Sequence, residues 1–178
     1  MGFELNQPAR IAPLSPEDIA GMREVIYRTW LATYPNAEHG ITLEDIVDTY
    51  EYEGRREEET AGWLAWLANP AEGFTVLVAK HDGRVVGVCL VIKHADQNKL
   101  DGMYVLPEHQ GQGIGTALWQ AAQDYLDPDK HTIVTVVAYT PAVKFYQSLG
   151  FVDTGKHPVD SEFKFKSGAV FPEVEMRL

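Results

Sequence analysis

The feature that most constrains this chain is a glycine-rich run at residues 110–115, which reads Gln-Gly-Gln-Gly-Ile-Gly. A strand-like stretch, residues 100–105, precedes it, and a helix-like stretch, residues 114–126, follows it. Glycine at every second position makes a turn without side chains, whose amides can approach a ligand closely. The unpaired N–H groups and the positive dipole end of the following helix point at the same place. The pattern therefore predicts an anion site, most often one for a phosphate.

Two common phosphate motifs do not fit the spacing. The dinucleotide fingerprint G-x-G-x-x-G would need glycine where Thr116 or Leu118 stands, counting from Gly111 or Gly113. The nucleotide P-loop needs a lysine after its last glycine, and no lysine follows these glycines. What remains is the pattern Q-x-x-G-x-G, placed after a strand and Pro107.

In this pattern the chain resembles the GNAT superfamily of acyl-CoA-dependent N-acetyltransferases. Residues 103–115, Met-Tyr-Val-Leu-Pro-Glu-His-Gln-Gly-Gln-Gly-Ile-Gly, look like that family's acetyl-CoA pyrophosphate loop. Residues 142–151, Ala-Val-Lys-Phe-Tyr-Gln-Ser-Leu-Gly-Phe, are similar to its downstream signature A-x-x-F-Y-x-x-x-G-F. The two signatures stand in the right order and spacing. The resemblance covers residues 74–178 well and the N-terminal part loosely.

The order of predicted elements agrees with this resemblance. A short strand at residues 9–14 is followed by helices, the first started by Ser15 and Pro16 and the others at 42–50 and 55–67. Strands at 74–79 and 84–92 are joined by a hairpin turn at Asp82 and Gly83, and a third strand covers 100–105. The helix at 114–126 precedes a strand at 132–138, a helix at 141–149 ended by Gly150, and two last strands. We expect an α/β GNAT fold, with a mixed central sheet of about seven strands flanked by helices on both faces.

Two smaller expectations concern how these elements pack. The stretch at residues 170–178 should close the sheet, and Pro172 indicates that this strand starts at an edge. The helix after the glycine run should present one apolar face. That face consists of Ile114, Ala117, Leu118, Ala121, Ala122 and Tyr125.

Length, charge and composition limit the classes of protein to which this chain can belong. The 178 residues predict one domain spanning 1–178. No apolar run approaches the roughly 20 residues of a membrane span, and the N-terminus has no apolar signal core, so we expect a cytoplasmic protein. The net charge of −11 argues against nucleic acid or an anionic membrane as partner. With six histidines at no ligand spacing and one cysteine, Cys89, which we expect in the core, no metal site is predicted.

The resemblance implies acetyl-CoA as co-substrate and names the residues that would hold it. The pantetheine arm would pair with the backbone of Met103, Tyr104 and Val105. The pyrophosphate would lie against the glycine run and the start of the helix. The full set is Met103, Tyr104, Val105, Gln110, Gly111, Gln112, Gly113, Ile114, Gly115, Thr116, Ala142 and Tyr139, the last standing where many members have asparagine.

Amide formation needs a neutral amine, and a lysine-like amine is only ~0.1% neutral near neutral pH, a penalty of roughly 4 kcal/mol. A carboxylate, a histidine or a water chain should therefore take its proton. The resemblance implies Tyr146 as the acid that protonates the departing thiolate, although an amphipathic packing role is the alternative. Lys99 stands where the family often carries a glutamate base. Asp101, two residues on and on the same strand face, is the nearest substitute, with an exposed structural carboxylate as the alternative.

Trp30 and Tyr34 stand four residues apart on a predicted helix. They would line the binding site of the acceptor amine, and the alternative is that they are ordinary core aromatics. We therefore expect an N-acetyltransferase acting on a primary amine of a small molecule or polyamine, by direct attack in a ternary complex, and a homodimer is plausible for the family. The alternatives are acetylation of a protein N-terminus or lysine, a non-catalytic acyl-CoA-binding regulatory module, and a nucleotide-binding protein.

Overall fold

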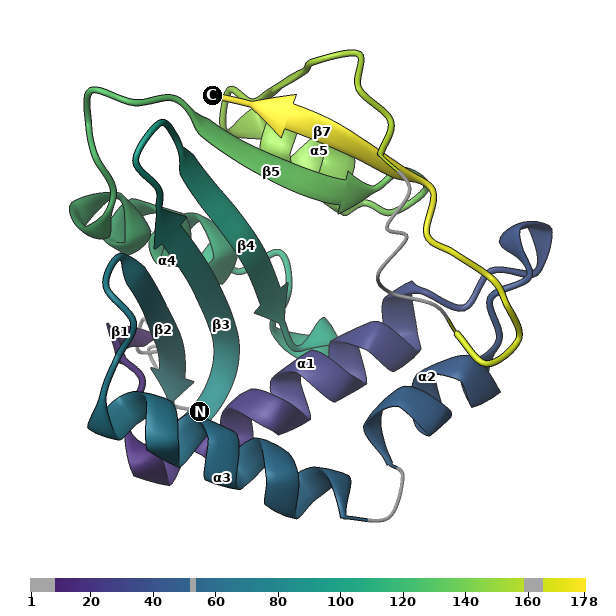
Figure 1. Ribbon diagram of the computed structural model, residues 1–178, viewed down its shortest axis with the longest axis horizontal. Helices are drawn as coiled ribbons and strands as arrows, with labels where there is room; N and C mark the ends of the chain where they lie inside the picture. Colours follow the sequence, from purple (N-terminus) through teal and green to yellow (C-terminus); the bar gives the residue numbers. More distant parts are fainter. Residues whose placement is uncertain (1–8, 52–53, 159–164) are drawn as a thin grey trace, which may run out of the picture.

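A seven-stranded mixed sheet forms the centre of the computed structural model, which describes residues 9–51, 54–158 and 165–178 (Figure 1). The strands follow the order β1-β2-β3-β4-β5-β7-β6. β4 and β5 pair in parallel, and all other neighbours pair antiparallel. The strands are β1 (Arg10–Pro13), β2 (Phe74–His81), β3 (Arg84–Lys93), β4 (Asn98–Val105), β5 (Thr132–Val137), β6 (Val152–Asp153) and β7 (Glu173–Arg177).

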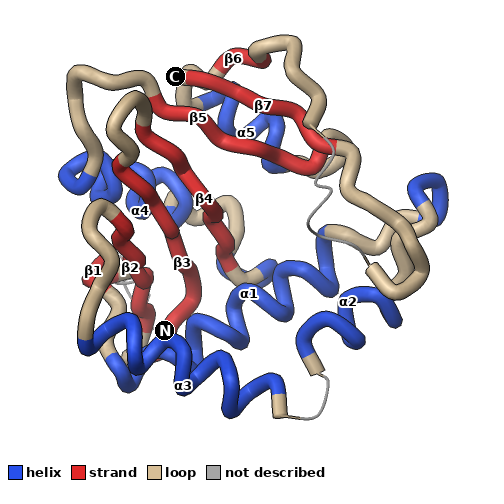
Figure 2. Tube along the Cα trace, viewed as in Figure 1, coloured by secondary structure: helices blue, strands red, loops and turns tan. Residues whose placement is uncertain are grey.

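Helices flank this sheet, which confirms the expected α/β class (Figure 2). In the view of Figure 1, α4 lies behind β2, β3 and β4, whereas α1, α2 and α3 lie together along the lower part of the molecule. The α-helices are α1 (Ile19–Thr33), α2 (Leu43–Tyr50), α3 (Arg55–Ala68), α4 (Ile114–Ala122) and α5 (Ala142–Ser148). Short 3-10 turns are η1 (Pro16–Asp18), η2 (Ala37–His39), η3 (Pro107–His109) and η4 (Gln123–Tyr125).

Local sequence signals set several of these boundaries as expected. Asp82 and Gly83 both have positive φ, 48° and 75°, as the tight turn between β2 and β3 requires. Thr42 caps α2, since its Oγ1 accepts from the Asp45 amide while the Asp45 carboxylate accepts from the Thr42 amide. Gly150, at φ 97°, ends α5 in the left-handed conformation.

The helix after the glycine run is shorter than expected. α4 ends at Ala122 and continues as a 3-10 turn, so Tyr125 does not share its apolar face and is 39% exposed. The prediction that Tyr125 belongs to this face is wrong because the change of helical pitch rotates it outward. Trp119, absent from the predicted face, is buried and meets the Phe151 ring at 5.4 Å between centroids.

The last strand lies inside the sheet, not at its edge. β7 pairs with β5 over its whole length, and β6 pairs with Met176 and Arg177 on its other side. Among the described strands, the partner of its first residues, Glu173 and Val174, is β5 alone. Pro172 therefore stands where one side of the strand is open, as its missing N–H predicts.

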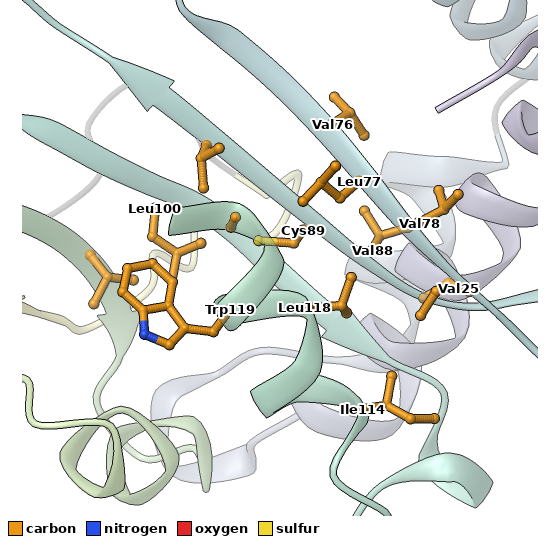
Figure 3. Packing of buried hydrophobic residues seen from close by; sticks show 14 of the residues in the cluster. Val25, Val76, Leu77, Val78, Val88, Cys89, Leu100, Ile114, Leu118 and Trp119 are labelled. Carbon is orange, nitrogen blue, oxygen red and sulfur yellow. The ribbon is translucent and has the colours of Figure 1, made fainter. Parts of the chain in front are cut away.

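The main core consists of side chains of the sheet packed against those of α4 and of α1 (Figure 3). Leu118 and Trp119 of α4 face β3 and β4, where Val88, Cys89 and Leu100 are buried. Cys89 is fully buried, and burial raises the pKa of its thiol to about 12. It is a core residue in its neutral form, as expected.

Candidate active site

A cavity of about 650 Å³ opens where β4 and β5 separate. The two strands pair from Asn98 to Leu100 on β4, and they diverge beyond that point, as Figure 1 shows. Residues 101–105 of β4 and 134–137 of β5 line the cavity. This part of β4 has no partner on that side among the described strands, so its backbone groups can bind a ligand there, apart from the Val105 carbonyl, which accepts from the Gln110 side chain.

The divergence coincides with a β-bulge in β4. Leu90 of β3 pairs with Gly102, whereas the next residue, Val91, pairs with Leu100, so Asp101 is the extra residue. Side chains of β4 therefore do not alternate strictly between the two faces of the sheet at this point. Asp101 lines the cavity, and Lys99 is not among the described residues that line it, although the sequence pattern placed both on one face.

The glycine run turns from β4 into the first turn of α4. Gly111 and Gly113 have φ values of 72° and 81°, which other residues adopt at a cost, and Gly113 is the N-cap of α4. A Cβ on Gly115 would come within 3.0 Å of the Phe145 ring, so this glycine lets α4 approach α5. The unpaired amides of the first helical turn and the positive dipole end face the cavity that the run lines.

Two sets of contacts hold this loop in place. The Arg28 guanidinium of α1 donates two hydrogen bonds, of 2.9 and 3.2 Å, to the Glu108 carboxylate. The Gln110 side-chain amide donates to the Val105 carbonyl at 2.9 Å, and that of Gln112 donates to the Glu108 carbonyl at 3.1 Å. Both glutamine side-chain amides therefore bind carbonyls of their own segment.

The cavity gathers most of the residues that the resemblance implies for the cofactor. Gln112 and Tyr139 are not among the described residues of its lining. Those that line it are Met103, Tyr104, Val105, Gln110, Gly111, Gly113, Ile114, Gly115, Thr116 and Ala142.

Tyr139 has a different place. Its hydroxyl donates to the Tyr34 carbonyl at 2.6 Å, and its ring stacks on His39 at 4.9 Å with an interplanar angle of 12°. It joins the loop after β5 to the end of α1. An aromatic residue here ties two elements of the cavity wall together.

Tyr146 of α5 lines the same cavity and is 5% exposed. Burial raises the pKa of its phenol well above the usual 10, with smaller contributions from Cys89 and Tyr104. The hydroxyl therefore keeps its proton at all physiological pH values. It is suited to donate a hydrogen bond, and not to act as a base.

Trp30 and Tyr34 both line the cavity and also pack as core aromatics, so the two interpretations of these residues are compatible. Their rings meet edge to face at 4.9 Å. Phe171 packs against both, at 5.7 and 4.8 Å, and also lines the cavity. Together they form an aromatic wall of the cavity.

Two carboxylates complete the lining. Asp101 contacts the Lys99 ammonium at 2.5 Å, and both side chains are about one-third exposed. Glu173, the first residue of β7, lines the cavity as well. Sequence reasoning missed Glu173, because nothing in a short C-terminal strand indicates that its first residue lines this cavity.

Two further properties hold for the part of the chain that the structure describes. No helix within 9–51, 54–158 and 165–178 is long and apolar enough to cross a membrane. The same ranges hold no group of three or more His, Cys, Asp or Glu residues placed to bind a metal ion.

The fold and cavity define a protein in which a strand, a glycine turn and a helix start border one cavity, and comparison with known proteins gives its family. Residues 48–166 match the acetyltransferase (GNAT) domain, and the chain belongs to this family. The chain is 33% identical over 107 residues to the L-amino acid N-acyltransferase MnaT of Escherichia coli K12, which covers 53% of this chain and 60% of that protein. It is 31% identical over 115 residues to the L-methionine sulfoximine/L-methionine sulfone acetyltransferase of Salmonella typhimurium, covering 58% of this chain and 66% of that protein.

The aligned part thus spans less than two thirds of the length of either relative. Among solved structures, the PaiA N-acetyltransferase of Thermoplasma acidophilum, in complex with coenzyme A, superposes with a TM-score of 0.66 at 21% identity. That match covers 96% of this chain and 99% of the other, and it shows the shared fold.

Proposed function

We propose that this protein is an N-acetyltransferase that moves the acetyl group of acetyl-CoA to a primary amine of a small molecule. One observation carries the proposal. The glycine run at the start of α4, the unpaired edge of β4 and the Tyr146 phenol all border one cavity, which also has an aromatic wall and two carboxylates. That arrangement matches a thioester with a phosphorylated tail on one side and an amine on the other.

The co-substrate would be held mainly by backbone. Amides of the glycine run and of the first turn of α4 are oriented toward a pyrophosphate. The pantetheine arm would pair with the open edge of β4 at residues 103–105, as an added strand does. The coenzyme A bound to the Thermoplasma relative supports this use of the fold.

The reaction would proceed by direct attack. The neutral amine nitrogen attacks the thioester carbonyl, a C–N bond forms, and the C–S bond breaks as the tetrahedral intermediate collapses. Asp101, directly or through water, would take the proton that the ammonium group loses. Tyr146 would donate to the departing sulfur, since burial keeps its phenol protonated. The proton that remains on the attacking nitrogen passes through the Tyr146 hydroxyl to the sulfur as the C–S bond breaks, so CoA leaves as the thiol, the phenol is regenerated and the acetamide carries no charge.

The small size of the acceptor, though not its charge, is supported by the two relatives, whose names specify L-amino acids and L-methionine derivatives as substrates. The volume of about 650 Å³ must hold both the reactive arm of the co-substrate and the acceptor. It therefore suits a small amine better than a protein surface.

The first test is calorimetric titration of the protein with acetyl-CoA, with ADP and NAD as comparison ligands. One-to-one binding of acetyl-CoA well above that of ADP is expected, because ADP lacks the arm that pairs with β4. The loaded protein is then assayed for thiol release with a panel of primary amines. Equal binding of ADP and acetyl-CoA, or binding without thiol release from any amine, would contradict the proposal.

A further inference from the structure

The Tyr104 side chain folds back over Gly102 inside the cavity. A Cβ on Gly102 would lie 2.9 Å from the Tyr104 Cε2 atom and 3.3 Å from its Oη atom. Gly102 has no positive φ, so its missing side chain serves to leave room for this ring. The phenol oxygen is thereby held at the level of residue 102, directly after the bulge at Asp101. The backbone of Tyr104 faces the proposed co-substrate, and its side chain has a separate role.

The phenol of Tyr104 belongs to a residue that lines the same cavity as the aromatic wall and the two carboxylates. Burial raises its pKa, and hydrogen bonding toward Trp30 and Tyr34 partly opposes that shift. The negative charges of Asp101 and Glu173 raise the pKa further, so both carboxylates act on this phenol. All five residues line the same cavity. A neutral hydroxyl and two carboxylates therefore converge on one region.

The charge of this region discriminates between classes of amine. Among the described residues that line the cavity, the carboxylates are Asp101 and Glu173, and none is lysine or arginine. An ammonium group finds a hydroxyl oxygen, carboxylates and aromatic faces here, all of which attract cations. A carboxylate next to the amine would instead approach Asp101 and Glu173, and the lysine that pairs with Asp101, Lys99, is not among the described residues of the lining.

We propose that Tyr104, Asp101 and Glu173 form a subsite for the acceptor's ammonium group, and that this subsite selects primary amines with no carboxylate beside the amine. The inference rests on the proposed function and adds the chemical class of its acceptor. Asp101 already holds one ammonium group, that of Lys99, at 2.5 Å. Lys99 also defines the rival arrangement, in which its ammonium group turns to bind an acceptor's carboxylate.

A matched pair of amines tests the selection. Pentylamine and L-norleucine differ by one carboxylate on the carbon that bears the amine. The subsite predicts that kcat/KM for pentylamine exceeds that for L-norleucine by about tenfold or more, as an unfavourable charge contact of about 1.4 kcal/mol would give. Equal values, or a preference for L-norleucine that disappears in Lys99→Met, would overturn the proposal and favour the rival arrangement.

Two variants assign the selection to the named residues. Tyr104→Phe removes the hydroxyl and keeps the ring, so KM for pentylamine should rise about tenfold, the usual effect of losing a hydrogen bond to a charged group. The Kd for acetyl-CoA should stay unchanged, which separates this role from a merely structural one. Asp101→Asn should reduce the preference for pentylamine over L-norleucine. Tyr125→Phe and Asp124→Asn, which alter exposed residues outside the cavity lining, serve as controls.

A binding measurement separates failure of the subsite from failure of the proposed function. Pentylamine and L-norleucine are titrated into the CoA-loaded protein by calorimetry. Tighter binding of pentylamine, weakened in Tyr104→Phe, supports the subsite even where neither amine is acetylated. Thiol release with both amines at equal efficiency leaves the acetyltransferase function intact and overturns the subsite alone.

Discussion

Tyr146 combines burial with a position on the cavity wall. Its ring packs at 5.4 Å from Phe145 and 5.6 Å from Phe151, so Tyr146→Phe keeps the packing and removes the hydroxyl. We expect kcat to fall about 100-fold or more, the usual contribution of a positioned proton donor. Acetyl-CoA affinity should remain the same. Steady-state thiol release and calorimetry measure the two quantities, and an unchanged kcat would remove Tyr146 from the mechanism.

The Tyr139 hydroxyl is expected to contribute to the stability of the fold. Its 2.6 Å hydrogen bond to the Tyr34 carbonyl joins the loop after β5 to the end of α1. Tyr139→Phe should lower the free energy of unfolding by about 0.5–1.5 kcal/mol. Urea denaturation provides the measurement, with Tyr125→Phe as the exposed control. If both variants unfold at the same urea concentration as the parent, the bond contributes nothing measurable.

At the scale of elements, the turn from β4 into α4 depends on backbone that other residues adopt reluctantly. Gly113→Ala places a side chain at φ 81°, which should cost about 1–2 kcal/mol of stability and weaken acetyl-CoA binding. Gly62→Ala is the matched control, because Gly62 lies within α3, has no positive φ, and has open space around its position in the described structure. This control should gain about 0.4–1 kcal/mol.

Thermal or urea unfolding of these two glycine variants, together with acetyl-CoA titration, checks the expectation. The opposite signs of the two stability changes separate the requirement for positive φ from a general effect of glycine. A Gly113→Ala variant as stable as the parent would show that the turn has no such requirement.

The elements that the sequence predicted well are those with local signals. Residues Asp82 and Gly83 specify a hairpin turn, and Thr42 with Asp45 specifies a helix start, because a few neighbouring atoms decide each case. The glycine run likewise predicts most of the cavity wall to which we assign the co-substrate. Each of these features depends on residues that are close neighbours along the chain.

The rest of the site depends on contacts between residues that are far apart in the sequence. The bulge at Asp101 arises from the register of β3 against β4, and Glu173 reaches the cavity because β7 is inserted between β5 and β6. The Tyr104 phenol meets Trp30 and Tyr34 because α1 packs against β4. No residue type in one sequence signals such pairings, so these parts of the site follow only from the tertiary fold.

At the scale of the whole molecule, buried phenols make stability depend on alkaline pH. Burial raises the pKa values of Tyr34, Tyr104 and Tyr146 above 10 in the folded state. In the unfolded chain the same groups release their protons near pH ~10. Above that pH the folded state binds more protons than the unfolded state, so the free energy of unfolding falls as pH rises.

Urea denaturation at about pH 8, 9, 10 and 11 measures this dependence. We expect the contribution of these tyrosines to the free energy of unfolding to be nearly constant up to about pH 9. Beyond about pH 10 the free energy of unfolding should fall more and more steeply. Tyr146→Phe should reduce the slope in the alkaline range, since it removes one of the groups. An identical slope in this variant would contradict the pKa shift of Tyr146.

The short pairing between β4 and β5 has a consequence for the lifetime of the protein. Within the described strands, residues 98–100 of β4 make the whole pairing between the group β1 to β4 and the group β5, β7 and β6. A thioester whose arm pairs with the open edge of β4 would complete the sheet, and at about 100 times its Kd it would add about 2.7 kcal/mol to stability. The apoprotein would then open and be proteolysed more readily than the loaded protein, so the abundance of this protein would follow the supply of acetyl-CoA.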